Sequence, residues 1–107
     1  MNILTFDIEE WFHILDHGST KNAKHWSNYE YRLESNMDRI FHLLDKHNQD
    51  ATFFCLGWVA EKFPNIIKKI DSLNFEIGSH SHMHQLAYEQ TKKEFSEDLN
   101  KSICALE

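Results

Sequence analysis

The chain has 107 residues, a hydrophobic share of 41%, three glycines and one proline, which fits a single globular domain and excludes a disordered or low-complexity chain. Its formal net charge is −6, and the 11 Lys and Arg residues form no basic stripe, so nucleic acid is not an expected partner. No apolar run reaches the roughly 18 residues of a membrane span, and the N-terminus lacks the pattern of a signal peptide; we therefore expect a cytoplasmic protein without a membrane span.

The first half of the chain predicts one strand, one long irregular segment and one helix. The apolar run 3–6 is the predicted strand, and it ends at Asp7, Glu9 and Glu10. Segment 11–31 is irregular and rich in His, Asn and aromatic residues, and loops of this length are often functional. A helix is predicted over 33–47, with Asn48 near its C-cap. Its apolar residues recur at spacings of three and four: Leu33, Met37, Ile40, Phe41 and Leu44.

The second half predicts two more strands and further helices. The β-branched and aromatic run 51–56 suits a buried strand, and 58–63 a short helical turn. Another helix begins near Pro64, and 75–79 is the third strand. The last helix begins at about Thr91, with a capping box formed by Thr91 and Glu94. We expect its core side to consist of Phe95, Leu99, Ile103 and Leu106.

The alternation of strands and helices predicts an α/β fold with a parallel sheet. Three strands over residues 1–107 would supply less than half of an α/β barrel, which needs roughly 250 residues, so we expect a partial barrel with flanking helices. Unpaired backbone groups at the sheet edges then need a cover. The candidates are a missing C-terminal half, a second copy of the chain, or a rearranged last helix.

Cysteines and tryptophans are expected to be structural. Cys55 and Cys104 lack metal-site spacing and favour reduced core thiols over a disulfide. Core or lid positions are favoured over a ligand platform for four aromatic residues: Trp11, Phe12, Trp26 and Trp58.

Carboxylates and imidazoles meet at one predicted sheet edge, because ligands bind where parallel strands end. In an extended segment Asp7 and Glu9 point to the same side. His80 and His84 follow the third strand, and on a helical turn their i, i+4 spacing would place both imidazoles together, as two-His metal sites require.

Purely structural interpretations of the same residues compete with the prediction of a metal site. His80–His84 could be a polar loop or a capped surface turn, since eight histidines produce such spacings by chance; His13 and His17 form another pair. Asp7 and Glu9 could serve a helix N-terminus or simply be solvated. His13 is a candidate substrate-binding residue only through its nearness to these acids.

Three motifs in order give the chain a resemblance to a known family. Thr5–Phe12 (TFDIEEWF), Ala51–Phe54 (ATFF) and Glu76–His84 (EIGSHSHMH) resemble the polysaccharide deacetylases of carbohydrate esterase family four. The resemblance implies a distorted α/β barrel and zinc-dependent removal of acetyl groups from glycans. It also implies that Asp7 is the general base and that His80 and His84 bind zinc, or another divalent metal, with Glu9.

The sequence departs from the family in two ways. Ile8 stands where many members have a second aspartate, so Glu9 is the expected acidic ligand and Glu10 the fallback. The family's later motifs, which supply an Arg, an oxyanion-binding N–H and a general-acid His, have no counterpart here. The hypothesis is the N-terminal portion of a deacetylase acting on an acetylated glycan, with a Trp11–His13 continuation that resembles members associated with exopolysaccharide synthesis. The alternative is a non-catalytic, metal-binding assembly module that pairs with a copy or a partner.

Overall fold

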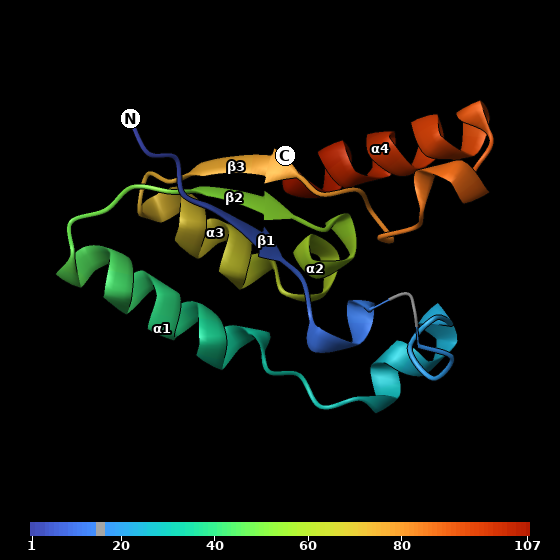
Figure 1. The fold of residues 1–107 in the computed structure, drawn as a ribbon, viewed down its shortest axis with the longest axis horizontal. Coiled ribbons are helices and arrows are strands. Elements are labelled where there is room, and N and C mark those ends of the chain that lie inside the picture. Colours follow the sequence, from blue (N-terminus) through green and yellow to red (C-terminus); the bar gives the residue numbers. More distant parts are fainter. Residues whose placement is uncertain (15–16) are drawn as a thin grey trace.

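A single parallel sheet organises the chain, as predicted. The structure is a computed structural model and describes residues 1–14 and 17–107 (Figure 1). Its strands are β1 (Thr5–Ile8), β2 (Thr52–Cys55) and β3 (Glu76–Ser79), paired in the order β1-β2-β3. The register aligns Asp7 with Phe54, and Phe54 with Gly78. The first strand begins two residues later than predicted, because Ile3 and Leu4 stay exposed while Ile8 is buried.

Helices follow each strand. The α-helices are α1 (Leu33–Lys46), α2 (Gly57–Lys62), α3 (Pro64–Ser72) and α4 (Lys92–Leu106). The described residues also form short 3-10 helices, η1 (Trp11–His13), η2 (Ala23–Asn28) and η3 (Ala87–Glu89). The described part of segment 11–31 is therefore less irregular than predicted. Pro64 is the first residue of α3, and Thr91 and Glu94 form the predicted capping box. Asn48 follows α1 with a φ of 49°, the left-handed conformation that asparagine tolerates at helix ends.

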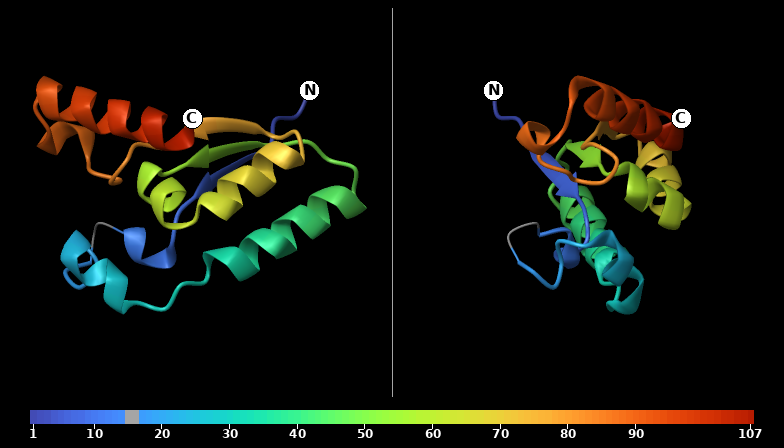
Figure 2. Two further views of the ribbon diagram at one scale, coloured as in Figure 1. Left: turned by 180° about the vertical axis from the view of Figure 1, so that it is seen from behind. Right: turned by 90° about the vertical axis from the view of Figure 1, so that its right-hand side faces the viewer.

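The sheet has one packed face and one open face, because side chains alternate along a strand. The packed face presents Ile8, Phe53 and Cys55 to α1 and α3, which lie side by side below the sheet in Figures 1 and 2. Phe53 anchors this core, with its ring centroid 5.8 Å from that of Phe41. Asp7 belongs to the open face. Polar residues that follow the strands on this face can therefore reach solvent.

Helix α4 packs differently from the prediction. It lies against α2 and the end of β3, and Ser102 is its fully buried residue. Its Oγ hydrogen-bonds Ser79 Oγ at 2.6 Å. The stripe expected to form the core side is instead exposed at three positions, Phe95, Leu99 and Ile103. Periodicity identified an apolar face of α4, but the small Ser102 allows closer approach to β3.

The expectations for aromatic residues and cysteines were correct in part. Phe12, Trp26 and Trp58 are buried in one cluster, while Trp11 is 40% exposed. Cys55 is a buried free thiol and Cys104 an exposed one, so the core position predicted for Cys104 was wrong. Among the described residues, no helix has the length and apolarity needed to span a membrane.

Candidate metal centre and active site

Side chains at the end of β1 and just after it point alternately into the protein and toward solvent. Ile8 and Glu10 turn into the protein and are 2% and 3% exposed, whereas Asp7 and Glu9 point to the open side. This is the alternation expected of an extended segment. It places the Asp7 and Glu9 carboxylates where β1 ends.

The segment after β3 brings two imidazoles to the same edge. His80 continues the ladder, with its N–H donating to the Cys55 carbonyl at 2.9 Å. The chain then leaves the strand in a loop that is not helical, so the i, i+4 spacing of a helical turn is not what brings the two imidazoles together. Ser81 and His84 adopt φ values of 64° and 57°, and this backbone path brings the rings of His80 and His84 to a centroid distance of 5.0 Å.

Three of the predicted ligands form one group with donor atoms suited to a divalent metal. One ligand atom each from Glu9, His80 and His84 lies within 4.8 Å of the others, and Glu9 Oε2 is 3.2 Å from His84 Nε2. Glu9 Oε2 and His80 Nε2 are buried atoms without a hydrogen-bond partner among residues 1–14 and 17–107. Buried polar atoms normally have partners, so these two atoms fit a metal that would be their partner. Two imidazoles and one carboxylate are a known ligand set for zinc.

A hydrogen bond orients one of these imidazoles. His84 Nδ1 lies 2.8 Å from the backbone carbonyl oxygen of His13. Because a carbonyl only accepts, Nδ1 carries the proton, and in the neutral ring Nε2 keeps its lone pair toward Glu9. Metal-binding histidines are commonly oriented in this way by a partner on the other ring nitrogen.

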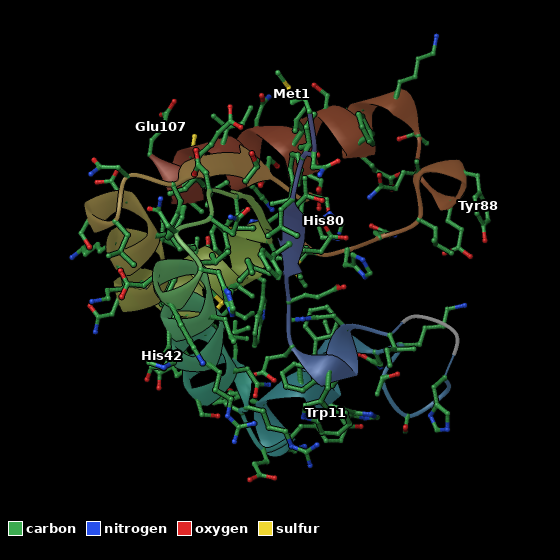
Figure 3. The ribbon with its side chains drawn as sticks, turned by 60° about the vertical axis from the view of Figure 1, so that its left-hand side comes forward. Met1, Trp11, His42, His80, Tyr88 and Glu107 are labelled. Atoms are coloured by element: carbon green, nitrogen blue, oxygen red, sulfur yellow. The ribbon has the colours of Figure 1, made fainter. Side chains whose placement is uncertain are left out.

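Asp7 lies next to the ligand group of Glu9, His80 and His84 but does not belong to it. Its Oδ2 lies 3.9 Å from His80 Nε2, and its side chain is 55% exposed. Figure 3 shows His80 next to β1, the strand that carries Asp7, and Trp11 well below it. The Asp7 carboxylate is therefore accessible to solvent next to the ligand group.

Glu10 has a structural role that the sequence did not reveal. Its Oε1 accepts from the backbone N–H groups of Arg32 and Leu33, both at 2.8 Å, where α1 begins. A carboxylate suits the N–H groups at a helix N-terminus. Glu10 is thus committed to α1, which is evidence against its fallback role as a metal ligand. No local sequence signal indicated this contact, because 22 positions separate Glu10 from Arg32.

The structure places His13 in the interior. Its side chain is 1% exposed, its Nδ1 accepts from the Glu10 N–H at 2.8 Å, and its ring packs edge-to-face on Trp26 and Trp58. Burial, and to a lesser extent the nearby His84, lower the pKa of His13 to about 3. This placement is evidence against the substrate-binding role predicted for the His13 imidazole. His13 contacts the site through its backbone carbonyl, which accepts the hydrogen bond from His84 Nδ1.

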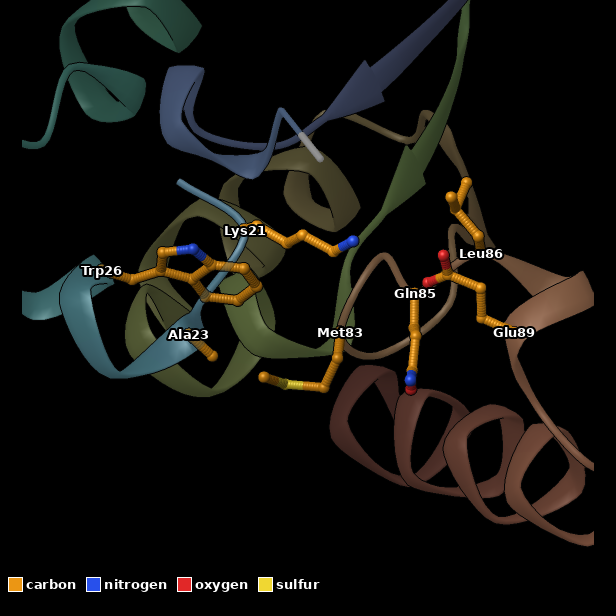
Figure 4. Close-up of a pocket in the computed structure, with 7 residues that line it drawn as sticks. All are labelled: Lys21, Ala23, Trp26, Met83, Gln85, Leu86 and Glu89. Atoms are coloured by element: carbon orange, nitrogen blue, oxygen red, sulfur yellow. The ribbon is translucent and has the colours of Figure 1, made fainter. Parts of the chain in front are cut away.

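A pocket of about 260 Å³ lies between two segments that flank this region (Figure 4). One wall comes from residues 21–26 and the other from residues 83–89, the segment that continues from the imidazole loop. The lining residues are Lys21, Ala23, Trp26, Met83, Gln85, Leu86 and Glu89.

Comparison with known proteins matches the chain to polysaccharide and peptidoglycan deacetylases. Residues 3–107 match the family model described as polysaccharide deacetylase. A peptidoglycan-N-acetylglucosamine deacetylase of Bacillus cereus is 39% identical over 64 residues, which is 60% of this chain and 23% of that protein. The chain spans about a quarter of the length of the curated relatives it matches.

Solved structures agree with the fold. The crystal structure of the Bc1960 peptidoglycan N-acetylglucosamine deacetylase aligns with a TM-score of 0.70 at 30% identity, covering 97% of this chain and 38% of that one. BA3943 of Bacillus anthracis, described as a CE4 family pseudoenzyme, aligns with a TM-score of 0.72 at 23% identity, covering 97% of this chain and 29% of that one. At that identity the second match shows the fold alone.

Proposed function

The chain belongs to the polysaccharide deacetylase family, and we propose that it carries the base and the metal ligands for removing acetyl groups from an N-acetylated polysaccharide. The observation that carries this proposal is the convergence of Glu9, His80 and His84, with two buried ligand atoms that lack hydrogen-bond partners in the described part of the chain. The name of the Bacillus cereus relative supports an N-acetylglucosamine polymer as the substrate class.

We assign the three ligands to a divalent metal and Asp7 to proton transfer. Glu9, His80 and His84 would hold the metal, which when bound would supply polarisation of the acetyl carbonyl and a lowered pKa of the attacking water. Asp7 accepts a proton from the attacking water as the new C–O bond forms, and its exposed carboxylate beside His80 suits this task. Breaking the C–N bond releases acetate and an amine. The proton for that amine comes from a group that we do not assign among the 107 residues.

Metal binding is the first test. We expect calorimetry to show one zinc ion per chain, with affinity reduced at least about 100-fold in Glu9→Ala and His84→Ala, more than the loss of a supporting partner costs. His42→Ala is a matched control, because His42 is exposed on α1, away from the ligand group. Equal affinities in wild type and both ligand variants would contradict the metal assignment.

Acetate release is the second test. In the protein at its full natural length, Asp7→Ala should lower acetate release from an N-acetylated oligosaccharide by about 100-fold or more while leaving zinc affinity within a few-fold of wild type. Undiminished release in Asp7→Ala would contradict its role as base.

A second candidate function is a metal-binding module without catalysis. It is favoured by the exposed apolar stripe of Phe95, Leu99 and Ile103 on α4, a surface that a partner or a second copy could cover. Zinc binding without acetate release from the natural-length protein would support it. Four points stay predictions from the sequence: zinc as the ion, an exopolysaccharide substrate, the cytoplasmic location, and a cover for the sheet edges supplied by a C-terminal half or a second copy.

A further inference from the structure

We propose that Asp98 is a positioning residue of this centre: its carboxylate holds the loop that carries His80 and His84 in the shape that brings their imidazoles together. The proposal rests on the proposed metal centre and extends it to a residue of α4. Asp98 lies outside all three motifs that gave the family resemblance.

Both oxygens of the Asp98 carboxylate are used on the loop backbone. Oδ2 accepts from the His82 N–H at 2.8 Å, and Oδ1 accepts from the Met83 N–H at 3.1 Å. Hydrogen bonds to a charged acceptor are stronger than neutral ones, and two bonds to consecutive N–H groups fix direction as well as distance. Asp98 therefore holds the loop midway between His80 and His84, the two predicted metal ligands.

The opposite side of the loop is held by α2. The carbonyls of Ser81 and His82 accept from the N–H groups of Gly57 and Trp58, at 2.9 and 3.0 Å. The backbone between His80 and His84 is thus bound to α2 through its carbonyls and to α4 through its N–H groups. This arrangement leaves the imidazoles of His80 and His84 free to face Glu9.

The loop needs such anchors because of its backbone conformation. Ser81 and His84 have φ values of 64° and 57°, in the left-handed region that non-glycine residues rarely adopt. The Ser81 hydroxyl accepts from the His84 N–H at 3.0 Å and supports the same turn from within. Without Asp98, two backbone N–H groups would lose their partners, and more extended conformations would compete. Those conformations would separate the imidazoles.

The test compares Asp98→Asn and Asp98→Ala with Glu97→Gln, because Glu97 is an exposed acid next in sequence whose carboxylate lies 3.8 Å from Lys93 Nζ. Asparagine has the shape of aspartate but offers one acceptor, and its NH₂ would face the second N–H. In metal-free protein we expect faster amide exchange at His82 and Met83 and loss of the ring-to-ring NOE between His80 and His84. We also expect about 10- to 100-fold weaker zinc binding, with Glu97→Gln like wild type.

The outcomes separate this inference from the proposed function. A folded Asp98→Asn with wild-type exchange and an intact NOE would overturn the positioning role, whatever its zinc affinity. Loss of the whole fold in Asp98→Asn, seen by circular dichroism, would also overturn it, because Asp98 would then support the structure in general. If wild type binds no zinc and the variants still lose the NOE, the metal assignment fails and the positioning role of Asp98 stands.

Discussion

Glu9 and Glu10 are chemically alike and adjacent, yet strand alternation gives them different partners. Glu9 faces the imidazoles, and Glu10 accepts from the first N–H groups of α1. Removing Glu10 should therefore affect folding, and removing Glu9 should affect ion binding.

We predict that Glu10→Ala lowers the free energy of unfolding by about 1–2 kcal/mol, the usual effect of losing an N-terminal cap. Glu9→Ala should change it by less than about 0.5 kcal/mol in the presence of a chelator, because its Oε2 has no hydrogen-bond partner to lose among the residues that the structure describes. Urea denaturation followed by circular dichroism measures both. Equal destabilisation by the two substitutions would show that the division of roles is wrong.

His13 should make the protein sensitive to acid. The pKa of His13 is about 3 in the folded chain, against an ordinary 6.5. Between pH 6.5 and pH 3 the unfolded chain therefore binds a proton at His13 and the folded chain does not. The contribution of this residue is fully present above pH 6.5 and falls as the pH drops toward 3, by about 2 kcal/mol at pH 5.

Urea denaturation of metal-free protein at pH 7 and pH 5 measures this loss. His13→Gln keeps an acceptor for the Glu10 N–H and cannot titrate, so its loss of stability between the two pH values should be smaller by about 2 kcal/mol. Identical losses in the variant and wild type would remove His13 as the source.

At the scale of elements, the contact between α2 and the imidazole loop depends on a glycine. A Cβ at Gly57 would lie 2.2 Å from His82 Nδ1 and 2.9 Å from Ser102 Cα, on α4. The second neighbour is backbone and cannot move alone. Gly57 therefore permits the close packing of α2, α4 and the loop.

We predict that Gly57→Ala destabilises the protein by about 1–3 kcal/mol, as overpacking does. Gly18→Ala is the matched control, because no atom of the described residues lies within 4 Å of a Cβ there, and it should be neutral within about 0.5 kcal/mol. Thermal unfolding of the pair measures the difference. A neutral Gly57→Ala would mean that the three elements are less tightly packed than described.

Local patterns predicted the elements well and their contacts less well. Spacing placed α1 and α3, and alternation correctly put Asp7 and Glu9 on the same side of β1. The sequence could not predict that Glu10 caps a distant helix, or that a non-helical loop brings His80 and His84 together. Both facts depend on tertiary hydrogen bonds between residues far apart in the chain, which leave no periodic signal.

At the scale of the whole molecule, α4 leaves an apolar stripe in the open. Phe95, Leu99 and Ile103 are 48%, 37% and 41% exposed and are spaced four apart on one side of the helix. Apolar stripes of this kind are typical of surfaces that contact other segments or partners.

The stripe should bind a reporter of apolar surface. We predict that wild type enhances the fluorescence of anilinonaphthalene sulfonate and that Leu99→Lys with Ile103→Lys lowers this enhancement by at least about half. The exposed pair Lys93→Ala with Lys101→Ala, on the same helix, is the control for changes in charge and composition. An unchanged signal in the Leu99 and Ile103 double variant would place the accessible apolar surface elsewhere.

The hydrogen bond from His84 to the His13 carbonyl joins positions 71 residues apart, and Glu9 meets the same imidazole. An ion shared by these residues would act as a reversible cross-link that ties the beginning of the sheet to its last strand. Because the unfolded chain holds no such preformed set of ligands, each tenfold excess of the ion over its dissociation constant would add about 1.4 kcal/mol to the free energy of unfolding. Heat tolerance would then follow metal supply, and a chelator would lower the unfolding temperature to that of the metal-free protein.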